Sequence, residues 1–163
     1  MIAAETIRVA TNRIKRGLNR IDKSLQSLDE SDLWKDFNPH LVSVGNIILH
    51  LIGNVNQHLV AGLGRGDYTR HRDREFVDKP CIAKGELLDR LAETVGRAIG
   101  VLEELVGDDL EDTYTIQGMQ YTGTGDVLAV LEHFSYHVGQ IVFATKLLKK
   151  ASLELSDDAA LNR

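Results

Sequence analysis

Hydrophobic residues recur along the chain in four segments, at the alternating three- and four-residue steps of an amphipathic helix. The apolar positions of the first segment are Ile7, Thr11, Ile14, Leu18, Ile21, Leu25 and Leu28. The second segment covers about residues 43–63, with Ser43 as its N-cap and Gly62 or Gly64 as a left-handed C-cap. Each pattern predicts a long helix with one apolar face.

Two further segments follow the same rule. The third covers about residues 84–106, ends at Gly107, and has as its apolar positions Leu88, Leu91, Val95, Ala98, Leu102 and Leu105. The fourth extends from near Gly125 to Lys150, through Val127, Leu131, Phe134, Val138, Ile141, Thr145 and Leu148. Apolar faces of this length can be buried only against one another. We therefore predict an all-α four-helix bundle, a single domain over residues 1–163, with a frayed tail at 156–163.

The connections predict the order of the helices. The connection between the second and third helices, "GRGDYTRHRDREFVDKPCIA", has about twenty residues, whereas bundle connections usually have roughly 2–8. A connection of this length can cross the bundle from end to end, which favours an up-down-down-up topology with a long crossover between helices 2 and 3. Between the third and fourth helices, "TYTIQGMQYTG" is typical of a short hairpin.

Composition narrows the class of protein. The net charge of −5 argues against a nucleic-acid partner, because such proteins usually carry a basic face. The single cysteine, Cys81, excludes an internal disulfide and a cysteine-rich zinc site. The N-terminus does not resemble a signal peptide, and no apolar run reaches the roughly 18 residues that cross a bilayer. We expect a soluble, cytoplasmic protein with no membrane partner.

The fourth segment carries His133 and His137, four residues apart. Residues at this spacing lie on the same side of a helix, about 6 Å apart along its axis, which suits two imidazoles that bind one metal ion. The metalloprotease pattern H-E-x-x-H is absent, because Phe134 follows His133. The pair alone is weak evidence, since zinc needs three or four ligands and such pairs also occur on solvated surfaces.

The residues alone leave the third ligand open. His40 and His71 lie in connections and are expected to be solvated, whereas His58 fits a partly buried structural histidine. His50 points nearly opposite the apolar face of the second helix, together with Asn46, Asn54 and Gln57. This polar strip is either a solvated face or the lining of a cleft.

Two stretches, "SVGNIILHLIGNVNQHLVAGLG" and "VLEHFSYHVGQIVFATKLL", resemble the DinB/YfiT-like superfamily of metal-dependent hydrolases and transferases. In that superfamily a histidine precedes a leucine on the second helix, as His50 does here, and the fourth helix carries H-x-x-x-H followed by x-G-Q-I. The stretch "LDESDLWKDFNPHLVSVGNI" resembles the branch described only as a domain of unknown function. The resemblance implies an up-down-down-up four-helix bundle. It also implies a divalent zinc or nickel ion held by His50, His133 and His137.

The resemblance further implies a metal-dependent enzyme, acting by thiol-dependent transfer or hydrolysis on a small-molecule substrate, with a low-molecular-weight thiol as cofactor and a homodimer as its assembly. Three neutral imidazoles would leave a coordination position open, as catalytic sites do. The alternative is a non-catalytic helical bundle for binding or assembly, with a structural metal or none. Asn54 and Gln140 could orient a ligand or a bound water. The basic stretch could receive an anionic thiol, although a solvated loop is favoured for Arg65, Arg70, Arg72 and Arg74.

Overall fold

The structure is a computed structural model and describes residues 2–150 and 152–153; the tail predicted to fray lies outside the described residues. Its long elements are α1 (Ile2–Ser27), α3 (Val44–Val55) continued by the π-helix η1 (Asn56–Leu63), α5 (Lys84–Glu104) and α7 (Gly123–Lys149). Its short helices are α2 (Glu30–Leu33), α4 (Arg72–Val77) and α6 (Gly107–Glu111). The all-α prediction is confirmed, apart from one small hairpin.

That hairpin consists of β1 (Thr113–Ile116) and β2 (Met119–Thr122), which pair antiparallel with Thr113 opposite Thr122. Its turn residues Gln117 and Gly118 both have positive φ, at 54° and 77°. Two consecutive residues of this kind are typical of the tight turns that match strand twist. The hairpin predicted from "TYTIQGMQYTG" is therefore confirmed.

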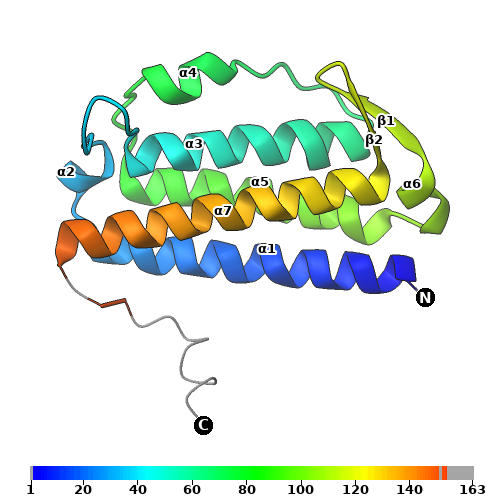
Figure 1. The fold of residues 1–163 in the computed structure, drawn as a ribbon, viewed down its shortest axis with the longest axis horizontal. Helices are drawn as coiled ribbons and strands as arrows, with labels where there is room; N and C mark the ends of the chain where they lie inside the picture. The colour runs from blue at the N-terminus through cyan, green and yellow to red at the C-terminus, as the bar shows by residue number, and fades with distance from the viewer. Residues whose placement is uncertain (1, 151, 154–163) are drawn as a thin grey trace, which may run out of the picture.

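The long helices lie lengthwise beside one another, with α7 along α1 and α3 beside α5 (Figure 1). From the end of η1 the chain returns along the outer side of α3 and forms α4 on the way (Figure 1). Consequently α5 begins near the same end of the molecule as α3 and runs in the same direction (Figure 1). The long connection is thus a covering layer over α3 rather than a tight turn.

The apolar faces of the long helices form one core, in which Ile14 and Ile21 of α1 and Phe134 and Ile141 of α7 are almost completely buried. On α5 the fully buried leucine at the first turn is Leu87, and Leu88 is only half-buried. Gly107 does not end α5 as predicted but begins α6. The helix stops earlier because the backbone is extended at Leu105, with φ −67° and ψ 136°.

The second helix begins as predicted, because the Ser43 hydroxyl accepts a hydrogen bond from the backbone N–H of Asn46 at 3.2 Å. Its continuation differs. From Asn56 onward the helix is a π-helix, with bonds such as the N–H of Gly64 to the carbonyl of Leu59 at 3.1 Å. The predicted glycine cap is wrong, since Gly64 has φ −73° and the left-handed residue is Arg65 with φ 55°. π-Helical turns inside helices frequently mark functional sites.

One helix, α7, is long and apolar enough to cross a membrane by length and composition, contrary to the expectation from the sequence. The core helix of a water-soluble protein meets the same criteria. In this structure α7 packs along α1 and buries Phe134, Val138 and Ile141 in the core. It also carries the carboxyl group of Asp126, which is fully buried within the protein and would be costly within a bilayer.

Candidate metal centre

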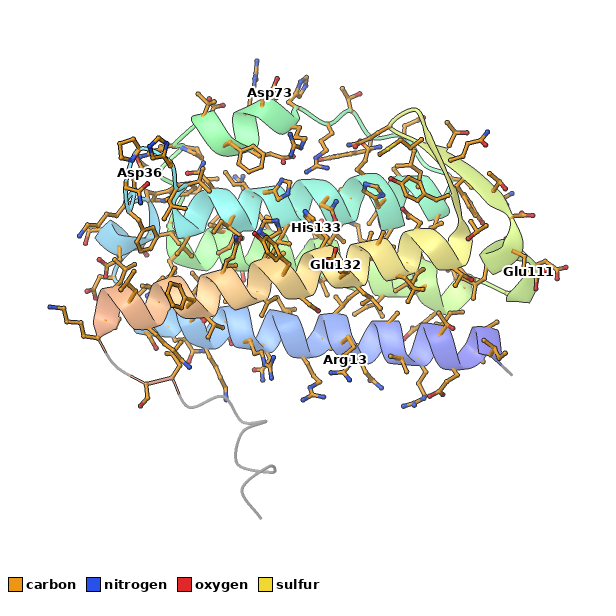
Figure 2. All side chains as sticks on the ribbon, viewed as in Figure 1. Arg13, Asp36, Asp73, Glu111, Glu132 and His133 are labelled. Atoms are coloured by element: carbon orange, nitrogen blue, oxygen red, sulfur yellow. The ribbon has the colours of Figure 1, made fainter. Side chains whose placement is uncertain are left out.

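Three histidines meet between α3 and α7. The Nε2 atom of His133 lies 3.0 Å from Nε2 of His50 and 3.2 Å from Nε2 of His137. In Figure 2, His133 lies on the side of α7 that faces α3. The structure thus brings together all three residues expected from the sequence, although His50 lies 83 residues before His133 in the chain.

The arrangement fits a single divalent ion. Two imidazole nitrogens about 2.0–2.1 Å from one tetrahedral zinc ion lie about 3.3 Å apart. The observed separations of 3.0 and 3.2 Å are close to that value. Among the described residues, the group contains these three imidazoles and no cysteine or carboxylate ligand. It is therefore a neutral donor set with room for a further ligand.

The ring of His50 is fixed by a carboxylate. Its Nδ1–H donates to Oε2 of Glu75 at 2.8 Å, so the lone pair of Nε2 faces the other two histidines. Glu75 is held in turn by Arg70, whose Nε and Nη2 donate to the two carboxylate oxygens at 2.7 and 2.8 Å. Carboxylate–histidine pairs of this kind orient metal-binding imidazoles and raise their basicity. The side chains of Arg70 and Glu75 are only 5% and 10% exposed.

Gly53 allows Glu75 to come this close. A Cβ atom at position 53 would lie 2.0 Å from Oε1 of Glu75 and 3.0 Å from Nε of Arg70. No side chain fits at such distances. Gly53 lies one turn after His50 on α3, so the absence of a side chain there makes room for the carboxylate that holds the ring.

Of the two interpretations of the polar strip on the second helix, a solvated face is wrong for its first three residues. Asn46, His50 and Asn54 are 0%, 4% and 8% exposed. The Asn46 amide donates to the carbonyls of Glu75 and Asp78, at 2.9 and 2.8 Å, at the end of α4. The strip is thus the surface onto which the long connection folds, and this contact places Glu75 over His50.

The ring of His137 is fixed from its own helix. Its Nδ1–H donates to Oε1 of Gln140 at 2.7 Å, which leaves the lone pair of Nε2 toward His133. Gln140 would therefore act on an ion bound by this group through His137. The ring of Tyr136 packs edge-on against His137, with centroids 5.1 Å apart. These contacts limit the rotation of the imidazole.

The surroundings of the two α7 histidines favour neutral imidazoles. Burial, together with the neighbouring His137 and His50, lowers the pKa of His133 to about 4. Burial also lowers the pKa of His137, although the hydrogen bond to Gln140 acts in the opposite direction. Burial opposes ionisation of Glu75, but hydrogen bonds from Arg70 and His50 outweigh it and lower the pKa of this carboxyl. At neutral pH His133 and His137 therefore offer uncharged nitrogens, the form that binds metals.

The lowered pKa of His133 predicts a pH dependence of the metal-free protein. This pKa is about 4 in the folded chain, against an ordinary value of 6.5, so the unfolded chain binds more protons between these values. The free energy of unfolding should therefore fall as the pH is lowered from 6.5 toward 4. The lowered pKa of Glu75 acts below its ordinary value of 4.5, outside most of this window. Urea unfolding at several pH values should show the slope, and His133→Asn should reduce it; an equal slope in that variant would contradict the assignment.

Three buried polar atoms on α3 and α7 have no hydrogen-bond partner among the described residues: Nδ1 of His133, Oδ1 of Asn54 and Oδ2 of Asp126. Asn54 is on α3, and the other two are on α7. Unpaired buried polar groups are costly and are frequent at functional sites. The expected role of Asn54 in orienting a ligand or water remains a prediction.

The remaining histidines do not join the centre. His58 is buried, as predicted, and its Nδ1 pairs with Oδ1 of Asp126 at 2.7 Å, which links η1 to α7. His40 and His71 are exposed, also as predicted. The expectation of a solvated basic loop is wrong for Arg70, because this residue is committed to Glu75.

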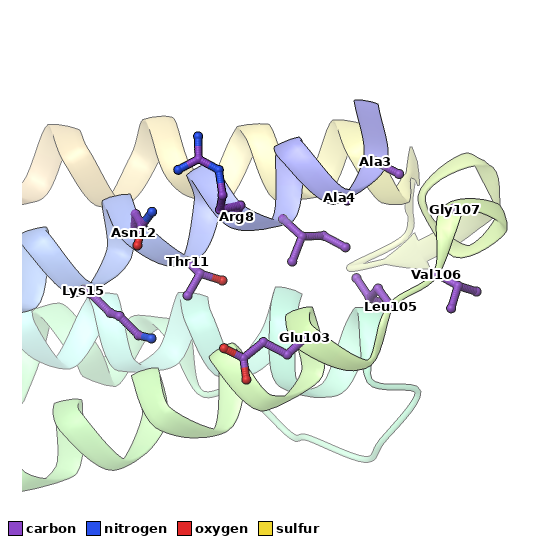
Figure 3. A pocket seen from close by; sticks show the side chains of 11 residues that line it. Ala3, Ala4, Arg8, Thr11, Asn12, Lys15, Glu103, Leu105, Val106 and Gly107 are labelled. Carbon is purple, nitrogen blue, oxygen red and sulfur yellow. The ribbon is translucent and has the colours of Figure 1, made fainter. Parts of the chain in front are cut away.

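A cleft with a volume of about 710 Å³ lies away from the histidines, between α1 and the end of α5 (Figure 3). Thr11 and Lys15 of α1 point into it toward Glu103 of α5 (Figure 3). Its lining includes neither histidine nor cysteine. Size alone therefore does not make this cleft the chemical centre, because the groups able to bind a metal converge elsewhere.

A profile of the family described as "Protein of unknown function (DUF1572)" matches residues 1–156. The chain belongs to this family. No curated protein matches it. The resemblance to the DinB-like proteins, in their branch of unknown function, is confirmed by the family together with the solved structures.

Two solved structures share the fold. The conserved protein of locus from Enterococcus faecalis has a TM-score of 0.76 at 16% identity, over 88% of this chain and 97% of that one. A DinB-like protein from Bacillus cereus ATCC 10987 has a TM-score of 0.68 at 15% identity, over 86% of this chain and 90% of that one. At these identities the likeness establishes the fold and leaves the chemistry to the residues of this chain.

Proposed function

We propose that this chain is a single-domain, up-down-down-up four-helix bundle that binds one divalent metal ion through His50, His133 and His137 and uses it in an enzymatic reaction. The directions of α1, α3, α5 and α7 support the topology (Figure 1). The observation that carries the proposal is the convergence of the three imidazoles, whose ligand nitrogens lie within 4.8 Å of one another. Zinc and nickel both accept imidazole ligands.

The chemistry follows from the donor set. A divalent ion held by neutral ligands keeps its full charge and lowers the pKa of a thiol or a water molecule in its open position, which provides a nucleophile at neutral pH. His50 and His137 would stay in place during the reaction, because Glu75 and Gln140 hold their outer nitrogens. Thiol-dependent transfer and hydrolysis of a small molecule both remain within this proposal.

The alternative, a non-catalytic bundle with a structural metal, is less well supported. Structural zinc sites usually have four protein ligands. The candidate group has three among the described residues, and a cleft reaches one of them, His137. Both features favour a centre that admits a further ligand.

A paired assay tests the reaction class. Zinc- and nickel-loaded protein is incubated with 1-chloro-2,4-dinitrobenzene, with and without 2-mercaptoethanol, and product formation is followed by absorbance. In transfer the sulfur–carbon bond forms, chloride leaves with the bonding electrons and the thiol proton passes to solvent. We expect metal-dependent turnover that His133→Ala abolishes. A rate equal to that of the metal-free protein would contradict transfer to this electrophile, and p-nitrophenyl acetate in place of both reagents tests hydrolysis.

We also propose a cytoplasmic homodimer. Ile2, Val9 and Leu128 on the outer faces of α1 and α7 are exposed, at 84%, 37% and 55%, and line one apolar groove with Leu131. Exposed apolar patches of this kind often mark interfaces. Light scattering that gives only the 18.1 kDa species at micromolar concentration would contradict the dimer.

A further inference from the structure

An apolar cleft adjoins the metal centre. It has a volume of about 420 Å³ and lies between the connection that precedes α3, the end of α4 and the second half of α7. Two of its lining residues belong to the centre itself, namely His137 and its partner Gln140. The ring of Phe76, on another wall, lies 4.7 Å from the ring of His50. The cleft therefore reaches the candidate metal centre at His137, and its Phe76 wall packs against the ring of His50.

The lining of the cleft is mainly apolar. Its walls include Phe37, Leu41, Ile47, Phe76, Phe143 and Leu147. Of the described residues that line it, none is a lysine, arginine, aspartate or glutamate. Small-molecule sites commonly have volumes of roughly 300–1,000 Å³, with apolar walls and a few polar groups that fix orientation. Here the side chains of His40, Tyr136, His137 and Gln140 are such polar groups.

The nearby cations do not serve this cleft. Arg70 is bound to both carboxylate oxygens of Glu75, and Arg72 lies over the Phe76 ring, 5.2 Å from its centroid, without lining the cleft. Arg65 pairs with Asp112 at 3.0 Å. An anionic ligand would thus lose its hydration in an apolar cleft and gain no lysine or arginine among the lining residues.

We propose that this cleft binds the substrate, and that the substrate is an uncharged small molecule with an apolar body, either an aliphatic chain of several carbons or one aromatic ring. The apolar body lies among Phe37, Phe76 and Phe143, and the reacting end lies at His137. This proposal rests on the function proposed for the metal centre, since it assigns the substrate class of that centre.

Two ligand series test the cleft and its link to the centre. The first is a set of linear alcohols from 1-propanol to 1-hexanol, titrated into metal-free protein and followed through the methyl NMR signals of Ile47 and Ala144. Burial of one methylene contributes about 0.8 kcal/mol, so affinity should rise about four-fold per carbon. The second compares 1-hexanol with 1-hexanethiol on cobalt-loaded protein, where the thiol should gain at least ten-fold in affinity and change the visible spectrum.

Matched variants separate the cleft from the rest of α7. Phe143 is 69% exposed and lines the cleft, whereas Leu128 is 55% exposed on the same helix and lies outside it. Phe143→Asp should weaken binding of 1-hexanol about ten-fold, because it adds a charge and removes apolar contact. Leu128→Asp should leave binding unchanged.

Affinity independent of chain length, or an equal effect of the two variants, would overturn the apolar cleft. If 1-hexanethiol binds cobalt-loaded protein no more tightly than 1-hexanol does, the link between the cleft and the metal centre is overturned. Failure of the proposed function would give a different result. The wild-type protein would then take up no metal, while the alcohols would still bind the metal-free protein.

Discussion

Replacing His137 by alanine is expected to remove nearly all bound metal while the helical fold persists. The variant leaves two imidazoles, which hold a divalent ion far less tightly than three. The decrease in affinity should exceed the factor of about 10–100 that removal of an outer partner costs. The fold should persist because Phe134, Val138 and Ile141 hold α7 in the core independently of the metal. Metal analysis after dialysis against zinc or nickel, together with circular dichroism, measures both quantities.

The control for this experiment is His40→Ala. His40 is exposed and lines the cleft beside His137, but it is not part of the convergent group. The control should keep its metal. Unfolding of His137→Ala would show that the ion is structural and would favour the non-catalytic alternative. Full retention of metal by His137→Ala would remove this residue from the ligand set.

The second large effect is expected from Gly53→Ala, a change in a residue that touches no metal. The new methyl group would lie 2.0 Å from Oε1 of Glu75, so the carboxylate must leave its position over His50. Metal affinity should therefore fall about 10–100-fold, as it does when the outer partner of a ligating histidine is lost. Isothermal titration with zinc measures the change.

Two comparisons make this result specific to Glu75. Gly96 lies within α5 and has open space where a Cβ atom would lie, so Gly96→Ala should leave metal affinity unchanged. It should also raise the free energy of unfolding by about 0.5–1 kcal/mol, because alanine favours a helix interior over glycine. In a Glu75→Ala background, Gly53→Ala should weaken metal binding no further. A further loss in that background would mean that Gly53 acts by another route.

Much of the fold follows from local patterns in the sequence. The periodicity of apolar residues predicts helices close to α1, α5 and α7, because each buries one face along its full length. Ser43 predicts the start of α3 because capping depends on one hydroxyl and a nearby backbone N–H. His133 and His137 are recognisable as a pair for the same reason: their relation is set by a single helix.

The rest depends on contacts between distant segments. His50 looks solvated on a helical wheel because the wheel does not include α4, which covers it and supplies Glu75. Arg70 and Glu75 lie in a charged connection without periodicity, so nothing in their local sequence indicates burial. The π-helix at Asn56–Leu63 has no counterpart in the apolar pattern, and its first residue, Asn56, is buried and accepts a hydrogen bond from the distant Arg97 of α5 at 2.9 Å.

The most direct test of the metal centre is a titration of metal-free wild-type protein with zinc and with nickel, followed by calorimetry and compared with His50→Ala. We expect saturation at a single ion per chain, proton release only as the pH is lowered toward the pKa of about 4 of His133, and loss of the binding isotherm in the variant. An isotherm that is absent in the wild-type protein, or that His50→Ala leaves unchanged, would contradict a centre built from His50, His133 and His137.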